Sequence, residues 1–174
     1  MTPEQRGLVF DLALGRIQPA DFEVRSGLIL RESGLGLHLL NESLASCEAD
    51  DVEAALLIAG RCGLTEDLVP VLCDLLGAPW HTRHEDIAHY LQELRDARSV
   101  PALALAATTR LAYLAYDDSH ALARKCSWAL ADIGTPEARE ALDLLSRAAD
   151  SEVAGYARRR LERWDVETSR KGRE

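Results

Sequence analysis

Hydrophobic residues recur at intervals of three and four along most of the chain, as they do on one face of an α-helix. Residues 49–63 (ADDVEAALLIAGRCG) begin with acidic residues and end in glycine, and residues 65–79 (TEDLVPVLCDLLGAP) begin at a potential threonine cap and end in Gly-Ala-Pro. No alternating run is bounded by a hairpin turn, so the pattern predicts an all-α protein, with helices of about 11 to 15 residues and short loops. The apolar stripes are Val52, Ala55, Leu56 and Ala59 in the first segment and Leu68, Val71, Leu72 and Leu75 in the second.

The first residues also predict a helix. Thr2 can cap it, Pro3 fits its first position, and Gln5 can complete a capping box with Thr2.

The helical segments repeat. VPVL at 69–72 precedes VPAL at 100–103 by 31 positions, and later pairs of apolar residues are offset by 39 and then by 31. The period is therefore 31 residues, interrupted once by eight extra residues near 108–119. Two antiparallel helices of about four turns cannot cover their own apolar faces, so successive pairs must stack into a curved rod. The pairs that define the later offsets are Leu91 with Leu94, Leu130 with Ile133, and Leu161 with Trp164.

Residues 121–164 resemble the HEAT repeat in its short, phycobilisome-lyase-like form. The marks are an Ala-rich helix ending in Leu130 and Ile133, a GTPEA turn at 134–138, and a second helix with Leu142 and Leu145. The resemblance covers about 50–165 and implies a right-handed α-solenoid of antiparallel helix pairs. We expect residues 1–49 to form an N-terminal helical cap and residues 166–174 a flexible basic tail, all in one continuous domain. Because this family includes scaffolds, lyases, hydroxylases and toxin-neutralising proteins, the resemblance says very little about function.

The 174 residues, 47% of them hydrophobic, suit one domain with a sizeable core, and the net charge is -9. Residues 1–157 hold 25 acidic against 13 basic residues, whereas residues 158–174 hold 7 basic against 4 acidic. An acidic body repels phosphate backbones, so we expect a basic protein partner and no nucleic acid.

The four cysteines, Cys47, Cys62, Cys73 and Cys126, match neither a zinc motif nor a compact disulfide pattern, and we expect buried thiols in a reducing compartment. No signal peptide is recognisable, and no apolar run reaches the ~18 residues that span a bilayer. A cytoplasmic protein without a membrane contact is expected.

HTRHEDIAHYL, residues 81–91, raises the question of a metal site. His84 and His89 lie five apart, about 140° around a helix, and cannot share a metal as the histidines of HExxH do. HEAT-like hydroxylases bind iron through several His-Glu pairs, but His84-Glu85 has no second pair here. Thr82 to Glu85 fits a capping box instead, so we expect a helix start on a polar face, no metal and no cofactor.

The resemblance also includes two other enzyme classes, bilin lyases and alkylpurine glycosylases. The sequence contains no residue set that would specify a bilin lyase. Cys73 and Cys126 fall on apolar stripes, and a buried thiol is inert. Alkylpurine glycosylases grip DNA with a basic face, and the final helix does carry Arg158, Arg159, Arg160 and Arg163. A solvated last turn that complements the helix dipole is the favoured interpretation of that cluster.

The eight-residue insertion is a better functional candidate. It supplies Tyr113 and Tyr116, followed by Asp117 and Asp118. Insertions in repeat arrays often form the binding face, and tyrosine is enriched at interfaces. The equally weighted alternative is that Leu111 and Leu114 pack inwards, the tyrosines flank them, and the acids cap the next helix at 119.

Glu140, Asp143 and Arg147 form a charged stripe on a second helix, of the kind that lines the concave face in this family. Such a stripe is usually only a solvated face. Trp80 is either a loop-edge anchor for a partner or a buried staple.

The sequence therefore favours a non-catalytic protein-interaction module, most pointedly a bacterial immunity or adaptor protein that covers a basic toxin with its acidic solenoid face. Monomer and homodimer both stay open. The alternative is a HEAT-type enzyme, either bilin lyase-like or a metal-dependent hydroxylase-like protein. The candidate partner-binding residues are Trp80, Tyr113, Tyr116, Asp117, Asp118, Glu140, Asp143 and Arg147, and no catalytic residues are assigned.

Overall fold

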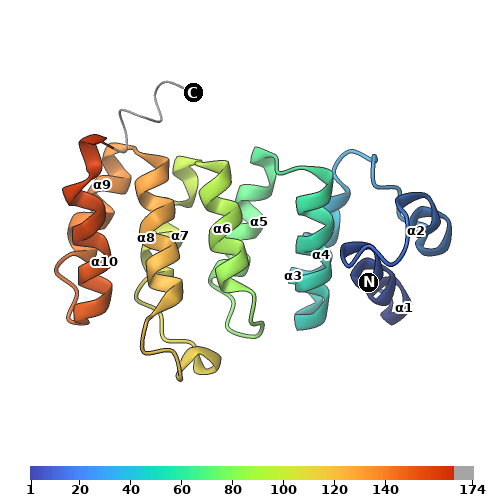
Figure 1. Ribbon diagram of the computed structural model, residues 1–174, viewed down its shortest axis with the longest axis horizontal. Coiled ribbons are helices and arrows are strands. Elements are labelled where there is room, and N and C mark those ends of the chain that lie inside the picture. The colour runs from blue at the N-terminus through green and yellow to red at the C-terminus, as the bar shows by residue number, and fades with distance from the viewer. Residues whose placement is uncertain (167–174) are drawn as a thin grey trace.

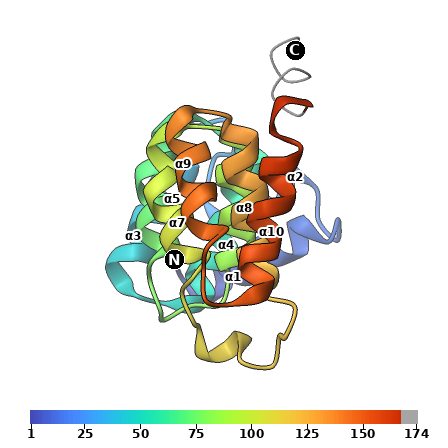
Figure 2. The ribbon, with the colours of Figure 1, turned by 90° about the vertical axis from the view of Figure 1, so that its left-hand side faces the viewer.

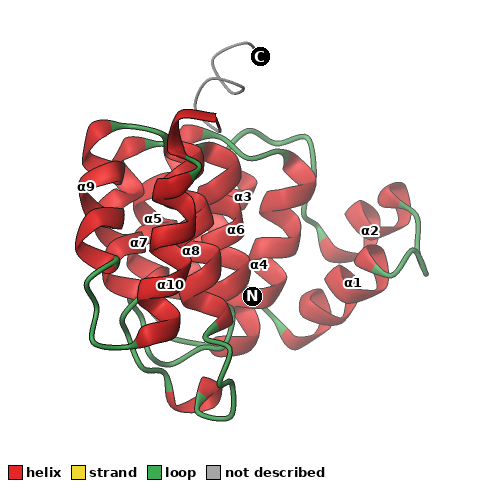
Figure 3. Cartoon of the chain, turned by 60° about the vertical axis from the view of Figure 1, so that its left-hand side comes forward, coloured by secondary structure: helices red, strands yellow, loops and turns green. Residues whose placement is uncertain are grey.

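The protein is all-helical in a computed structural model that describes residues 1–166, and no strand occurs in that range (Figures 1 and 3). The predicted basic tail at 166–174 lies outside the described residues except for Val166. The helices are α1 (Pro3–Ala13), α2 (Pro19–Ser26), α3 (Leu35–Ser46), α4 (Ala49–Cys62), α5 (Val69–Leu76), α6 (His84–Leu94), α7 (Val100–Ala106), α8 (Ala121–Ile133), α9 (Pro136–Leu145) and α10 (Ser151–Glu162), with 3-10 turns η1 (Glu66–Leu68), η2 (Ala97–Ser99) and η3 (Ala112–Leu114).

From α3 onward the helices form two layers (Figures 1 and 2). Helices α4, α6, α8 and α10 lie side by side in one layer, and α3, α5, α7 and α9 lie side by side in the other. Consecutive helices cross from one layer to the other, so each pair packs against the next. Helix α1 packs on α4, and α2 packs on α1 at the N-terminal end.

The apolar stripes face the space between the layers, as their spacing predicts. Leu72 of α5, Leu103 of α7 and Leu142 of α9 are each fully buried, and they are separated by 31 and 39 positions. These offsets match those found in the sequence, so the buried leucines occupy corresponding places in successive helix pairs.

The capping box at Thr2 and Gln5 is confirmed, and Thr135 caps α9 as the GTPEA turn suggests. The expected helix start at Thr65 is wrong, because a 3-10 turn follows it and α5 begins only at Val69. Proline lacks an N–H and is accommodated only in the first helical turn, so Pro70 places the start of α5, and Pro101 does the same for α7. Both helices are therefore shorter than the expected 11 residues.

The predicted burial of all four cysteines is wrong in part. Cys126 is buried and Cys73 half-buried, whereas Cys47 and Cys62 are exposed; all four thiols are free. Cys47 is the left-handed residue that ends α3, and Cys62 is the last residue of α4, where its thiol donates to the Leu30 carbonyl over 3.2 Å. Burial raises the pKa of Cys73 to about 11 and that of Cys126 to about 12.

In residues 1–166 no helix is both long and apolar enough to cross a membrane.

Candidate functional site

The insertion joins α7 to α8 and projects from the edge of the stack at which α6, α8 and α10 begin (Figure 1). We call this region the insertion edge; it comprises the loops 77–83, 107–120 and 146–150. Loops 107–120 and 146–150 together line a pocket of about 700 Å³. The pocket has an apolar floor that includes Leu111, Leu114 and Leu122, with polar groups on its wall.

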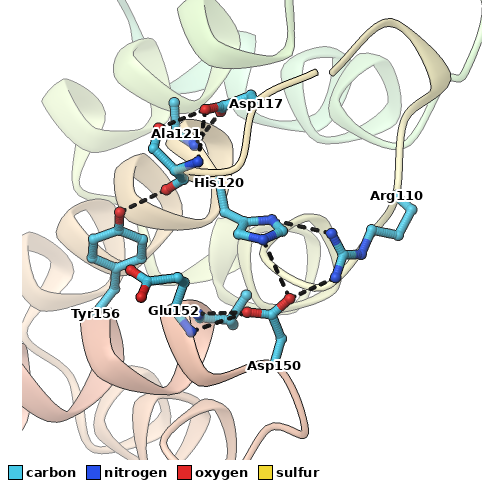
Figure 4. Close-up of polar contacts among 9 residues, drawn as sticks. Arg110, Asp117, His120, Ala121, Asp150, Glu152 and Tyr156 are labelled. Carbon is cyan, nitrogen blue, oxygen red and sulfur yellow. Dashed lines mark hydrogen bonds and ion pairs between the residues drawn. The ribbon is translucent and has the colours of Figure 1, made fainter. Parts of the chain in front are cut away.

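The C-terminal end of the insertion is fixed by hydrogen bonds (Figure 4). The Asp117 carboxylate accepts from the Ser119 amide and hydroxyl over 3.0 and 2.5 Å and from the Ala121 amide over 2.7 Å. The Tyr156 hydroxyl of α10 donates to the Ser119 carbonyl over 2.6 Å. Hydrogen bonding from Ser119 and Ala121 lowers the pKa of Asp117, so the carboxylate stays charged and caps α8.

A second set of contacts ties the insertion to the start of α10 (Figure 4). His120 Nε2 lies 3.3 Å from the Asp150 carboxylate, and Arg110 contacts the same carboxylate over 2.5 Å and His120 Nδ1 over 3.2 Å. Asp150 also caps α10 by accepting from the Val153 and Glu152 amides, and these bonds lower its pKa. His120 adopts a left-handed conformation, with φ at +48°, which an L-residue rarely holds without such contacts.

The pocket wall offers little for nucleophilic chemistry. Thr108 and Thr109 provide its hydroxyl groups, and both donate to the Leu105 carbonyl. The His120–Asp150 pair therefore faces no serine or cysteine among the lining residues and acts as a tie between two loops.

The α5–α6 turn and the insertion are joined by a row of aromatic rings. Trp80 meets His81 edge-on at 5.1 Å between centroids, His81 stacks on His84 at 4.2 Å, and His84 stacks on Tyr113 at 5.6 Å. Through His81 and His84 the row connects Trp80 to Tyr113, two candidates that lie far apart in the sequence and are not themselves in ring contact.

Both central histidines are buried, which corrects the expected helix start on a polar face. Nε2 of His81 donates to the Leu75 carbonyl and Nε2 of His84 to the Ala78 carbonyl, each over 2.8 Å. The Nδ1 atoms accept from the Arg83 amide over 3.0 Å and from the Tyr113 hydroxyl over 3.1 Å. Protein contacts thus occupy all four ring nitrogens of His81 and His84, the atoms through which an imidazole would bind a metal.

Burial sets the protonation states of this row. It lowers the pKa of His84 to about 4, with His81 acting in the same direction, and it also lowers the pKa of His81. It raises the pKa of the Tyr113 hydroxyl to about 12. The expected Thr82–Glu85 capping box does not form, because α6 begins at His84 without a side-chain cap.

The other candidates are either structural or exposed. In the insertion, Tyr113 and Asp117 form hydrogen bonds within the protein. Leu111 and Leu114 pack against the core. Tyr116 is 83% exposed, and Asp118 is also exposed.

The expected stripe on a second helix holds only for Glu140 and Asp143, because α9 ends at Leu145 and Arg147 lies in the turn after it. Arg147 still pairs with Asp143 over 2.6 Å, and Glu140 is exposed.

Two exposed leucines were missed by the sequence interpretation. Leu105 of α7 and Leu144 of α9 are 66% and 70% exposed, and they lie 39 positions apart at corresponding places in their helices. Both lie near the C-terminal ends of their helices, beside the insertion edge. The repeat offset would have revealed the pair, since an apolar residue recurred at a position outside the buried stripe.

The arginine cluster at the end of the chain is not uniformly solvated, contrary to expectation. Arg160 is buried and its guanidinium lies 3.7 Å from the ring centroid of Trp128. Arg159 lies over Tyr156 at 4.9 Å, and Arg158 donates to the Ser146 carbonyl.

In residues 1–166 no group of three or more His, Cys, Asp or Glu side chains is arranged to hold a metal ion.

Comparisons of the chain with family models, with curated proteins and with solved structures found no match.

Proposed function

We propose that the two layers form a short right-handed α-solenoid of HEAT-like repeats, with α4–α5, α6–α7 and α8–α9 as successive pairs. The alternation of layers supports this proposal, as do the corresponding burial of Leu72, Leu103 and Leu142 and the similar exposure of Leu105 and Leu144. Residues 1–49 supply α1, α2 and α3, of which α1 covers part of α4 at the N-terminal end.

We propose further that the protein is a non-catalytic binding module for another protein. The observation that carries this proposal is Tyr116, which is 83% exposed on a loop fixed by Asp117, His120 and Tyr156. An ordered loop loses little conformational entropy on docking, and an exposed tyrosine offers a large contact area with a polar end. Leu105 and Leu144 add apolar area beside it.

Charge indicates the kind of partner. Acidic residues outnumber basic ones at the insertion edge and in the helix starts beside it, in a chain of net charge -9. The net negative charge would steer a basic protein towards this edge, where the exposed Asp118 lies close to Tyr116 in the sequence. This arrangement suits a cytoplasmic immunity or adaptor protein that covers a basic toxin. The acidic residues are Glu85, Asp86, Asp117, Asp118, Asp150 and Glu152, and the basic ones are Arg83, Arg110, Arg124, Lys125 and Arg147.

The test begins with affinity purification of the tagged protein from its own cells, identification of the bound protein, and reconstitution of the complex from purified components. Tyr116→Ala is expected to weaken the reconstituted complex about tenfold or more, because interface tyrosines often contribute beyond 1.4 kcal/mol. Val24→Ala, at a residue 86% exposed on α2, is the matched control and should bind normally. An acidic partner, or equal binding by both variants, would contradict the proposal.

A further inference from the structure

A second concave site lies on the outer side of α8 and α10, apart from the insertion pocket. It is a groove of about 440 Å³ that shares no lining residue with that pocket. Its lining residues are Arg124, Ser127 and Trp128 from α8, and Glu152, Tyr156, Arg159 and Arg160 from α10.

The groove is cationic on an acidic protein. It contains three arginines and one glutamate, whereas the chain as a whole carries a charge of -9. No carboxylate of residues 1–166 forms an ion pair with Arg124 or Arg159, although Arg83, Arg110 and Arg147 elsewhere are each paired. Two exposed guanidiniums therefore keep their hydrogen-bond donors available to a ligand.

Aromatic rings hold the cationic side chains in place. Arg160 stacks on Trp128, and Arg159 lies over Tyr156, whose hydroxyl is itself bonded to Ser119. Such cation–π contacts reduce the freedom that an arginine would lose on binding an anion. Trp128 is 40% exposed, so part of its ring remains available for apolar contact beside the guanidiniums.

We propose that this groove binds an acidic peptide segment of a protein partner, with carboxylates on Arg124 and Arg159 and a neighbouring apolar side chain on Trp128. Guanidinium and carboxylate match in charge and in bidentate geometry. The limited volume accepts a few side chains, whereas a nucleic acid would extend beyond the groove, where an acidic surface repels its phosphates. The proposal does not depend on the basic partner proposed for the insertion edge, although Glu152 and Tyr156 place the groove next to that edge.

The experiment uses the full chain and a fluorescein-labelled peptide, acetyl-EEFEE-amide, in a fluorescence anisotropy titration. We expect it to bind about tenfold or more tightly than acetyl-QQFQQ-amide, since one or two charge-assisted hydrogen bonds exceed 1.4 kcal/mol. Arg124→Gln/Arg159→Gln should weaken binding by a similar factor. Arg25→Gln/Arg61→Gln removes the same charge from exposed arginines on α2 and α4, and should leave binding within about twofold.

The position of the peptide is read from the indole N–H signals of the three tryptophans, Trp80, Trp128 and Trp164, in a ¹H–¹⁵N NMR spectrum. Trp128→Phe assigns its signal, and circular dichroism verifies that every variant is folded. Only the Trp128 indole should shift when EEFEE is added.

Four results would overturn the proposal. These are equal binding of the EEFEE and QQFQQ peptides, equal losses in the two double variants, a shift at Trp80 or Trp164 in place of Trp128, and tighter binding of inorganic phosphate or a short oligothymidylate than of EEFEE.

Discussion

At the scale of single residues, the stacked rings of His81 and His84 decide how the α5–α6 turn meets the insertion. Both rings are 1% exposed, and every ring nitrogen is used by a carbonyl, an amide or the Tyr113 hydroxyl. The partners of His81, a carbonyl and a backbone amide, fit only a neutral imidazole with the proton on Nε2, and burial favours the neutral form of His84. Protonation would place an N–H of His81 against the Arg83 amide and would bury a charge at either ring, so the stability of the row should be sensitive to pH.

We expect the free energy of unfolding to fall between pH 7.5 and pH 5. The unfolded chain takes up protons below the ordinary histidine pKa of about 6.5, whereas folded His84 does so only near its pKa of about 4. Because the unfolded state then binds more protons, stability is complete above pH 6.5 and is lost as the pH falls towards 4, with about 2 kcal/mol lost by pH 5 through His84 alone.

Urea denaturation at the two pH values measures this loss. His84→Gln should show a smaller difference between the two pH values than the unmodified protein, even though it is less stable at both. His89→Gln is the control, because His89 is exposed and pairs with Glu93 on the surface. An unchanged pH difference in His84→Gln would show that the buried ring does not govern the effect.

Asp117 and Asp118 are adjacent in the sequence but have different roles, which single substitutions can distinguish. Asp117 caps α8 through Ser119 and Ala121, whereas Asp118 is exposed and its side chain makes no such bond. Asp117→Ala should lower Tm by about 2 to 4 °C, as expected for the loss of a helix cap in a chain of this size. Hydrogen exchange of the amides of Ser119 and Ala121 should quicken in the same variant.

Asp118→Ala carries the same change of charge and should leave both Tm and exchange unchanged. If the two variants behaved alike, the effect would be one of net charge and the cap would not explain the order of the loop.

At the scale of helices, close approach at one glycine determines how α3 packs against α4. A Cβ at Gly36 of α3 would lie 2.8 Å from the Ala59 Cα of α4, whereas a Cβ at Gly7 of α1 would meet nothing within 4 Å. Backbone atoms cannot yield as a flexible side chain does, so α3 and α4 would have to separate to admit a methyl group.

Gly36→Ala is therefore expected to lower the free energy of unfolding by about 1 to 3 kcal/mol, despite the better helix propensity of alanine. Gly7→Ala should raise it by about 0.5 to 1 kcal/mol, because there only the propensity changes. Chemical denaturation of the two variants measures both effects. Stabilisation by Gly36→Ala would mean that the two helices are not in tight contact.

Most of the helices could be predicted from the sequence, because apolar spacing and capping residues act locally. Thr2, Thr135 and the offsets of 31 and 39 marked helix starts and repeats, whereas the start of α5 depended on recognising that Pro70 must lie in a first turn. The effect of a single proline on a helix start can also be read from the local sequence. The wrong start of α5 at Thr65 could therefore have been avoided.

The candidate site was less predictable, since its residues meet through the tertiary fold. Trp80 reaches Tyr113 only through two buried histidines, and Asp150 reaches His120 only because loops 107–120 and 146–150 share one edge. Both tyrosines in the insertion read alike in the sequence, yet Tyr113 is a packing residue and Tyr116 is exposed. The burial of Arg160 depends in the same way on Trp128 of a different helix.

At the scale of the whole molecule, the helices form a row in which the principal contacts join neighbours (Figure 1). The insertion edge and the arginine groove both lie towards the C-terminal half of this row, on α6 to α10. In a one-dimensional stack, stability is close to a sum of local terms, so damage at one end need not reach the other.

Leu40 of α3 and Leu142 of α9 test this property, because both are fully buried leucines in opposite halves of the row. Replacing either with alanine should cost about 2 to 5 kcal/mol locally through lost burial and a cavity. In native-state hydrogen exchange, Leu142→Ala should speed exchange in α8, α9 and α10 while α3 and α4 keep their rates, and Leu40→Ala should give the reverse. A uniform increase along the chain in both variants would instead identify a single cooperative unit, in which a partner bound at the insertion edge would stabilise the N-terminal helices as much as the C-terminal ones.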